Sequence, residues 1–477
     1  MQNNITQSLV WKFLERFSVQ FVQFFVSIII ARLLMPEEYG IMAILSIFIT
    51  LSATIVQSGL GAALIQKKEV SVEDFSTVLY YSLSLAFLLY ILLFFLSPHI
   101  ALFFKQAQLE KVLKIASLIL FLGALNSVQL AYVSRNLLFH KLFIASLISV
   151  LISGGIGIIM AYYNYGVWAL VGQQLSYQLG ICILLKIMTR MKILFQFSFS
   201  KAKYAIKFGL GILLADLVDK LYHNLENIII GKNFSSSTLA FFDRGKQFPL
   251  ILINNIDGSI QSVMFPSFAK CQENLFDLKQ LLRKSIRMST FLSFSAMSLL
   301  FSIAPFLIQL LLGEKWMGCV PFLQLYCIIT MLFPMQTANI QAYNAIGNSK
   351  LYLQLISIKR AVGTILLLAV AIYIKDVFAI VWTCFILELF AIIINLYPNK
   401  KILKYSIKEL FLDILPNILI VINVLCIDLL CSKLISIPST LIIFFLQVII
   451  GGFIIILTAL LTKNPSFLYI VKYVIKK

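Results

Sequence analysis

Apolar runs of about 20 residues recur from one end of the chain to the other, and no other feature restricts its fold as strongly. A run of this length crosses a bilayer as an α-helix, because a helix satisfies its own backbone hydrogen bonds in hydrocarbon. Hydrophobic residues make up 60% of the 477 positions and charged residues only 12%. No long polar segment remains for a soluble domain. The sequence therefore predicts an all-α polytopic membrane protein.

Charges and turn residues divide the apolar runs into about fourteen expected transmembrane helices. Their approximate cores are 11–33, 41–65, 77–97, 113–134, 143–163, 167–187, 204–230, 248–268, 288–312, 320–345, 351–374, 377–397, 412–432 and 438–462. The N-terminal segment lacks the basic region and cleavage site of a secretory signal, so the first helix is expected to stay in the mature protein.

The 39 basic residues give a formal net charge of +19, and they gather in alternate loops. This asymmetry follows the positive-inside rule and predicts that both termini are cytoplasmic. Lys220 lies within a span. The charge is therefore explained by membrane topology, and nucleic acid is not an expected partner.

Polar positions repeat along the sequence. A shift of 200 residues places Arg16 on Asp216, Gln20 on Lys220, Gln23 on His223 and Gln57 on Asp257. A shift of 210 places Asn126, Ser127 and Gln129 on Gln336, Thr337 and Asn339. With six helices per repeat, the two repeats have the same orientation in the membrane. We expect pseudo-symmetric six-helix lobes at 1–200 and 201–400, and two further helices with a basic tail at 401–477.

The seventh expected helix carries several ionisable residues within a third of its circumference, namely Asp216, Asp219, Lys220, His223 and Glu226. Asp216 with Lys220, and Asp219 with His223, are spaced to pair on adjacent turns. The set is either a self-neutralising network that holds the helix in its bundle or the polar wall of a cavity. In the second interpretation Asp216, Asp219, His223, Glu226 and Asp257 of the eighth helix are candidates for proton or cation coupling.

The first expected helix places Lys12, Glu15, Arg16, Gln20 and Gln23 on one side. Lys12 and Arg16 are either anchors near the cytoplasmic end or an anion-binding pair, because guanidinium groups suit phosphate oxygens. The candidates for binding an anionic head group are Arg16, Lys220, Lys12, Gln20 and Gln23. Further polar residues that could complete the wall are Gln57, Asn254, Asn255, Asp257 and Gln261.

The sequence offers little for catalysis or metal binding. It contains no nucleotide phosphate loop, its three histidines are far apart, and its seven cysteines are scattered without metal-ligand spacing. We expect no enzyme activity, no cofactor and no metal.

The motifs W-x-x-L-E-R-F at Trp11–Phe17, I-I-I-A-R-L-L-M-P-E-E-Y-G-I-M-A around Pro36 and G-L-G-A-A-L-I-Q-K-K at Gly59–Lys68 resemble one family. They are similar to the Wzx-like polysaccharide transporters of the MOP flippase superfamily, of the colanic-acid and teichuronic-acid exporter type. The resemblance implies a bacterial cytoplasmic membrane protein with a V-shaped twelve-helix core that alternates between inward-open and outward-open states.

It further implies that the substrate is an undecaprenyl-pyrophosphate-linked oligosaccharide, flipped to the outer leaflet for O-antigen, capsule or exopolysaccharide synthesis. The resemblance implies cationic residues in the cavity, and in this chain the first candidate is Arg16 and the second is Lys220. The acidic residues of the seventh helix would partly neutralise such a cavity, which departs from a simple cationic cavity. Expected partners are membrane lipids and the polymerase and glycosyltransferases of the same pathway. Alternatives are a cation-coupled exporter of small molecules, of the multidrug type, and a non-transporting scaffold for glycan synthesis.

Overall fold

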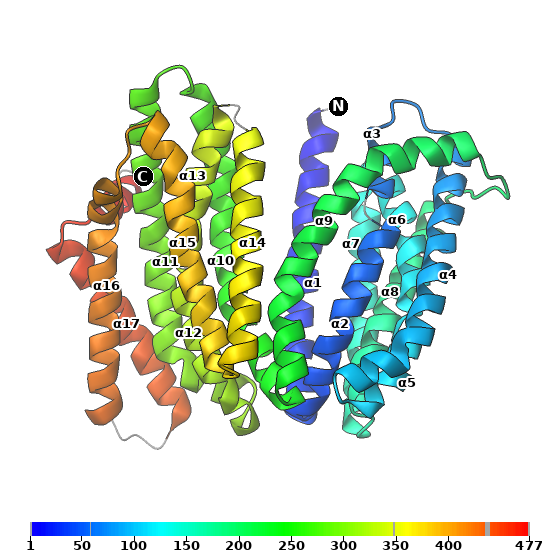
Figure 1. The fold of residues 1–477 in the computed structure, drawn as a ribbon, viewed down its shortest axis with the longest axis horizontal. Helices are drawn as coiled ribbons and strands as arrows, with labels where there is room; N and C mark the ends of the chain where they lie inside the picture. Colours follow the sequence, from blue (N-terminus) through cyan, green and yellow to red (C-terminus); the bar gives the residue numbers. More distant parts are fainter. Residues whose placement is uncertain (1, 58, 347–348, 435–438, 476–477) are drawn as a thin grey trace. The chain divides into compact units, whose positions relative to one another are not determined.

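The computed structural model describes residues 2–57, 59–346, 349–434 and 439–475, and these form helices joined by short turns without a β-strand. The chain divides into two compact units, Met1–Ala240 (unit 1) and Phe241–Lys477 (unit 2) (Figure 1). A helical membrane protein was the fold class predicted from the apolar runs.

Unit 1 is a bundle in which α7 lies between α1 and α8, while α2 packs against α4, α6 and α9. Its helices are α1 (Gln2–Leu33), α2 (Pro36–Gln57), α3 (Leu60–Gln66), α4 (Val72–Phe103), α5 (Ala107–Ala116), α6 (Ile119–Arg135), α7 (Phe139–Tyr162), α8 (Val167–Thr189) and α9 (Phe199–Asn233). The next helix, α10 (Ser236–Lys270), begins in unit 1 and continues into unit 2.

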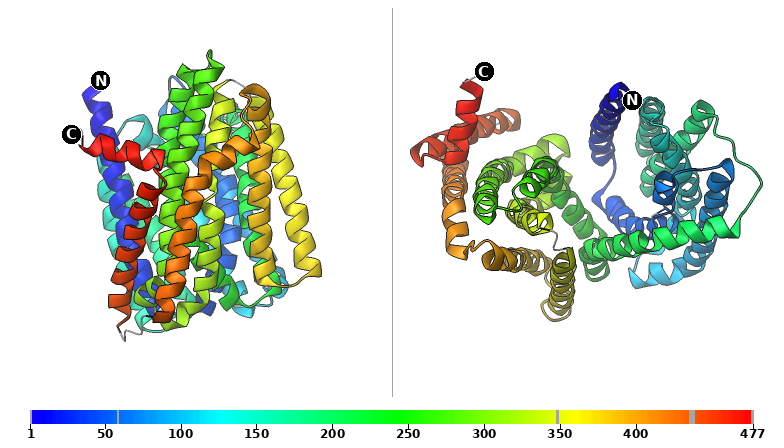
Figure 2. Two further views of the ribbon diagram at one scale, coloured as in Figure 1. Left: turned by 90° about the vertical axis from the view of Figure 1, so that its left-hand side faces the viewer. Right: turned by 90° about the horizontal axis from the view of Figure 1, so that it is seen from above.

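Unit 2 is built around α11, which contacts α12, α13, α16 and α17. Its remaining elements are α11 (Leu275–Leu311), the 3-10 helix η1 (Glu314–Cys319), α12 (Val320–Thr330), α13 (Phe333–Ala345), α14 (Ser349–Tyr373), α15 (Val377–Ile402), α16 (Ile407–Leu434), α17 (Thr440–Leu461) and α18 (Pro465–Ile475). In Figure 2 the two added C-terminal helices, α16 and α17, run beside α11.

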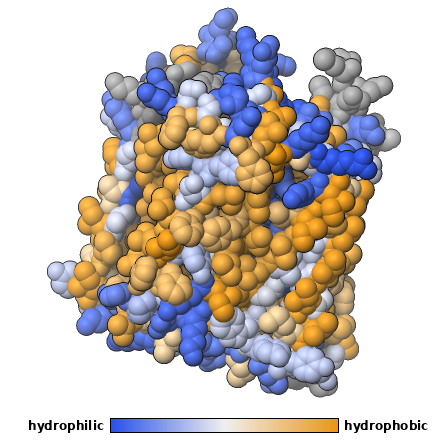
Figure 3. All heavy atoms as spheres, turned by 90° about the vertical axis from the view of Figure 1, so that its right-hand side faces the viewer, coloured by the Kyte–Doolittle hydropathy of each residue, from blue (hydrophilic) through white to orange (hydrophobic). Residues whose placement is uncertain are grey.

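Within the described residues, twelve helical segments are long and apolar enough to cross a membrane. The other two expected spans coincide with α9 and α10, which are 35 residues long each but carry charged and amide side chains in their middle sections. We therefore most expect functional polar side chains within the membrane in these two helices. The surface in Figure 3 is typical of a membrane protein, because on the side of unit 1 a broad hydrophobic zone lies between hydrophilic ends.

Helix boundaries follow the sequence repeat. With a shift of 200, the end of α1 at Leu33 meets the end of α9 at Asn233, and the start of α2 meets the start of α10. With a shift of 210, the starts of α7 and α8 meet those of α14 and α15. The fourth and tenth spans each contain a break, between α5 and α6 and between α12 and α13. The sequence repeat therefore matches the order of the helices. The expected lobe boundary at residue 200 stays a prediction, because α9, which follows it, packs within unit 1.

The α1–α2 turn shows how local sequence sets a helix start. Pro36 opens α2 with its φ angle already fixed, and the Glu38 carboxylate accepts a hydrogen bond of 2.8 Å from the backbone N–H of Met35. Gly40 in the same turn lies against the start of α10, where a Cβ atom would be 2.0 Å from the backbone oxygen of Ser236. The two repeat-related turns therefore touch through backbone atoms, which only glycine permits at position 40.

We expect Gly40→Ala to lower the free energy of unfolding by about 1–3 kcal/mol, because the new methyl group must displace backbone rather than a flexible side chain. Thermal denaturation of the purified protein in detergent measures the effect. Gly155→Ala in α7 is the matched control, because nothing lies within 4 Å of its added Cβ atom. Equal melting temperatures for the two variants would contradict the close contact.

Candidate functional site

Helix α1 is attached to unit 1 along one face. Val19, Val26 and Ile30 are buried, and the last two lie against Gly154 and Gly157 of α7. Near its beginning, Lys12 Nζ pairs with Glu15 Oε2 at 2.8 Å. Lys12 thus has a local carboxylate partner, which reduces the positive charge that it can offer to an anion.

The remaining circumference of α1 is divided between a polar stripe and an aromatic ladder. Arg16, Gln20 and Gln23 of the predicted binding set are exposed along the stripe. On the neighbouring side four phenylalanines follow one another at four-residue spacing, with ring centroids 4.8–6.2 Å apart, namely Phe13, Phe17, Phe21 and Phe25. These rings are 49–69% exposed. One membrane helix therefore presents a cation and amides beside a continuous apolar surface.

Helix α9 carries its predicted residues on a half-exposed face. The Asp219 and His223 side chains approach at 3.5 Å, as their spacing predicted. Lys220 instead turns to α2, where its ammonium group donates a hydrogen bond of 2.6 Å to the buried hydroxyl of Thr54. Asp216 and Glu226 are partly buried. In unit 1, α9 packs on α2, α3 and α4 whereas α1 packs on α7, so a shared cavity wall of α1 and α9 remains a prediction.

The other predicted wall residues lie on α2 and α10. Gln57 is pressed against Gly123 of α6. In α10, Asp257 Oδ2 accepts a hydrogen bond of 2.7 Å from the Thr337 hydroxyl of α13 and a longer one of 3.3 Å from Gln261. Asp257 Oδ1 is buried and has no hydrogen-bond partner among the described residues. Asn254 and Asn255 are exposed.

A polar cluster that the sequence patterns did not identify joins α13, α14 and α15 of unit 2. Gln336 donates a hydrogen bond to the Glu388 carboxylate and accepts one of 3.1 Å from Asn395 Nδ2. The ammonium group of Lys359 donates to Asn395 Oδ1 at 3.2 Å, and Glu388 is close enough to attract its charge. We call Gln336, Lys359, Glu388 and Asn395 the α13–α15 cluster. Thr337, next to Gln336, connects it with Asp257.

Unit 1 contains a neutral counterpart of this cluster. Asn126 Nδ2 of α6 donates to Gln178 Oε1 of α8 at 2.7 Å, and the same two positions shifted by 210 are Gln336 and Glu388. The counterpart of Lys359 is Ser149 of α7, whose hydroxyl is buried. The repeats therefore share the hydrogen bond, but only unit 2 adds an acid and a base to it.

Two features of the sequence could have indicated the cluster. Lys359 falls inside the expected span 351–374, and it lies ten residues after the start of α14 at Ser349, about 15 Å along the helix. Glu388 is a single acid inside the apolar run of α15. Both residues are charged and lie within an apolar span, and the same pattern identified the candidate residues of α9.

These helices define a class of protein, the polytopic helical membrane proteins with two repeated bundles. The chain is similar to the structure of the lipid II flippase MurJ in an inward closed conformation, with a TM-score of 0.74, 14% sequence identity, and coverage of 96% of this chain and 99% of that chain. It is also similar to an inward-facing multidrug resistance transporter of the MATE family and MOP superfamily, with a TM-score of 0.58, 14% identity, and coverage of 81% and 96%. At these identities the likeness shows the fold, and it confirms the predicted fold class.

Residues 29–321 match the family described as polysaccharide biosynthesis protein, and the chain belongs to that family. The resemblance inferred from the motifs of the first two helices is thereby confirmed.

Three relatives illustrate the range of the similarity. The chain is 24% identical to the teichuronic acid biosynthesis protein TuaB of Bacillus subtilis (strain 168), over 77% of this chain and 76% of that protein. It is 23% identical to the succinoglycan biosynthesis transport protein ExoT of Rhizobium meliloti (strain 1021), over 68% and 66%. It is 21% identical to the lipopolysaccharide biosynthesis protein WzxC of Escherichia coli (strain K12), over 64% and 62%.

We expect Lys359 and Glu388 to depend on one another energetically. Lys359→Met and Glu388→Gln should each lower the free energy of unfolding, and their combined effect should differ from the sum by about 0.5–3 kcal/mol, because each charge is held in one network. Thermal denaturation of the two single variants and the double variant measures this coupling. Lys270→Met, at an exposed lysine of unit 2, is the control for charge loss. Strict additivity would show that the α13–α15 cluster does not act as a unit.

Proposed function

We propose that this protein moves an undecaprenyl-pyrophosphate-linked oligosaccharide from the cytoplasmic to the outer leaflet by alternating access, for synthesis of a surface polysaccharide. Membership of the polysaccharide biosynthesis family and the names of TuaB, ExoT and WzxC support a substrate of this class. Transport rather than catalysis fits the chain, since its helices present scattered polar side chains within apolar spans. The lipid-linked sugar and the surrounding lipids are then its first partners.

The observation that carries this proposal is the surface of α1. A lipid-linked sugar has an anionic, hydrated head and a long apolar tail, and the head cannot cross about 30 Å of hydrocarbon unaided. On α1, the Arg16 guanidinium and the amides of Gln20 and Gln23 lie beside the ladder of exposed phenylalanines. The guanidinium can bind diphosphate oxygens while the tail follows the aromatic rings. Lys220 on α9 is the second cation that we assign to the head group.

Ion coupling is proposed for ionisable residues of the second repeat. Asp216, Asp219, His223 and Glu226 of α9 and Asp257 of α10 remain the candidates, and the α13–α15 cluster adds Glu388. Each is an ionisable group placed within an apolar span, where such groups usually serve transport.

We further propose that the protein resides in a bacterial cytoplasmic membrane with both termini in the cytoplasm, as the distribution of basic residues indicates. The polymerase and glycosyltransferases of the same pathway are its proposed protein partners. These enzymes would supply the lipid-linked repeat unit and consume it after flipping.

The pool of lipid-linked oligosaccharide tests the function directly. Depletion of the protein should cause completed repeat units to accumulate on the cytoplasmic side while surface polysaccharide is lost. Analysis of the accumulated lipid by mass spectrometry would also identify the cargo. An unchanged pool and unchanged surface glycan in a strain without a second flippase would contradict the proposal. Sensitivity to cationic drugs in that strain would then favour the cation-coupled exporter, which the acidic residues of α9 also fit.

Arg16→Ala should lower export while the protein still inserts in the membrane, because the variant loses the exposed cation of the polar stripe. Arg16→Lys should restore part of the export, since it keeps the charge but loses the planar donor geometry. Surface polysaccharide relative to membrane-inserted protein is the measurement. Lys111→Ala, at an exposed lysine of α5, is the control. Normal export by Arg16→Ala would exclude Arg16 as an essential contact.

A further inference from the structure

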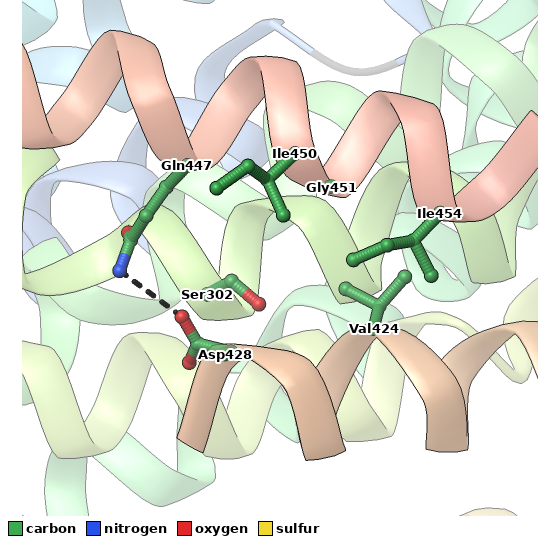
Figure 4. A pocket seen from close by; sticks show the side chains of 7 residues that line it. All are labelled: Ser302, Val424, Asp428, Gln447, Ile450, Gly451 and Ile454. Atoms are coloured by element: carbon green, nitrogen blue, oxygen red, sulfur yellow. Dashed lines mark hydrogen bonds between the residues drawn. The ribbon is translucent and has the colours of Figure 1, made fainter. Parts of the chain in front are cut away.

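A small cavity with three polar side chains in its lining lies between α11, α16 and α17 of unit 2, and it shares no residue with the α13–α15 cluster. Its volume is about 10 Å³, which is the space of one water molecule or a small ion. The residues that line it are Ser302, Val424, Asp428, Gln447, Ile450, Gly451 and Ile454. Figure 4 shows one polar side chain from each helix directed into this space, and apolar side chains closing the rest.

The polar groups of the cavity do not satisfy one another. Gln447 Nε2 of α17 donates a hydrogen bond of 3.1 Å to Asp428 Oδ1 of α16. The other amide atom, Gln447 Oε1, and the hydroxyl of Ser302 from α11 are buried without a hydrogen-bond partner among the described residues. Gln447 is 7% exposed and Ser302 is 5% exposed, so bulk water does not hydrate them. The Ser302 hydroxyl is therefore left with free coordination capacity beside the carboxylate. A 180° rotation of the Gln447 amide, in place of its hydrogen bond to Asp428, would present Gln447 Oε1 there as a second oxygen ligand.

The charge of Asp428 is also unbalanced. Among the described residues of unit 2, no lysine, arginine or histidine forms an ion pair with it, whereas Asp413 on the same helix pairs with two arginines. An ionised carboxylate within an apolar span is costly unless an opposite charge lies beside it. Asp428 lies in the last third of α16, between neighbouring helices rather than in a loop.

We propose that Asp428, Gln447 and Ser302 bind one sodium ion. The available ligands are a carboxylate, an amide oxygen and a hydroxyl, and hard cations prefer such oxygen donors. A single carboxylate balances a single positive charge, whereas a divalent ion would leave an uncompensated charge in the membrane. The cavity is water-sized, which suits Na⁺ better than the larger K⁺.

The bound ion would connect three helices that also meet through apolar contacts along this seam. Ile454 of α17 and Val424 of α16 belong to one buried hydrophobic cluster with Phe291 of α11. Gly451 faces Leu299 of α11 so closely that an added Cβ atom would lie 2.6 Å from its Cδ1 atom. An ion at the centre of this seam would fix α17 on α11 and α16. The proposal does not depend on the identity of any transported substrate.

Binding of ²²Na⁺ to the purified full-length protein, in detergent and in buffer of choline chloride, tests the site. We expect saturable binding of one ion per chain that unlabelled Na⁺ displaces more effectively than K⁺. Addition of NaCl should also raise the melting temperature above that in choline chloride of equal ionic strength, because a ligand that binds only the folded state stabilises it. The four tryptophans provide a fluorescence signal for the thermal transition.

Three substitutions locate the ion. Asp428→Asn keeps the size of the side chain but removes its charge, and it should lower the affinity for Na⁺ by about tenfold or more. Ser302→Ala and Gln447→Leu should weaken binding less, and they keep the test valid if Asp428→Asn does not fold. Glu273→Gln, at an exposed acid of unit 2, is the matched control and should bind like the wild type.

Lys433 follows Asp428 by five positions and its side chain lies outside the described residues, so Lys433→Ala is included. It should leave Na⁺ binding unchanged. Absence of Na⁺ binding by the wild-type protein, or equal binding by wild type and Asp428→Asn, would overturn the proposal. In that case Asp428 would be a protonated carboxyl beside a trapped water molecule.

Discussion

A buried polar side chain needs a polar partner, and such pairs decide which helices of this protein stay together. The clearest case is Asp413 of α16, whose carboxylate is fully buried. It accepts hydrogen bonds of 2.8 Å from the Nε atoms of both Arg283 and Arg287 in α11, and one of 2.9 Å from the Tyr405 hydroxyl. Apolar surface alone could let α16 slide or rotate on α11, whereas this geometry fixes both its depth and its orientation.

The same constraint extends from α16 to the end of the chain. Asn417, one turn after Asp413, donates to the Thr290 hydroxyl of α11 at 2.8 Å and accepts from Asn464 at 2.7 Å. Asn464 begins the turn into α18, so one buried amide joins three segments. The two helices added to the repeated bundles are thus held by directional bonds at one end and by the apolar cluster near Ile454 further along.

How much of this the sequence predicts depends on whether the information is local. Helices and their order follow from run length and turn residues, because a spanning helix is self-sufficient in backbone hydrogen bonds. The Asp219–His223 contact follows from spacing within one helix. The partner of Lys220 does not: spacing favours Asp216, but Thr54 lies 166 positions away and is brought close only by the packing of α2 on α9. The partner of Lys359 is not local either: the residue falls inside the expected span 351–374, but Asn395 lies 36 positions away and is brought close by the packing of α14 on α15.

The two repeats also show which interactions a duplicated fold must keep. The hydrogen bond between Asn126 and Gln178 and that between Gln336 and Glu388 occupy equivalent positions, so packing needs this contact in both bundles. Charge at these positions is not needed for packing, because the neutral version in unit 1 is sufficient. An acid at 388 and a base at 359 add a desolvation cost that the neutral pair avoids. Their presence in one repeat alone therefore argues for a role other than packing. It supports the proposal that the ion-coupling residues lie in the second repeat.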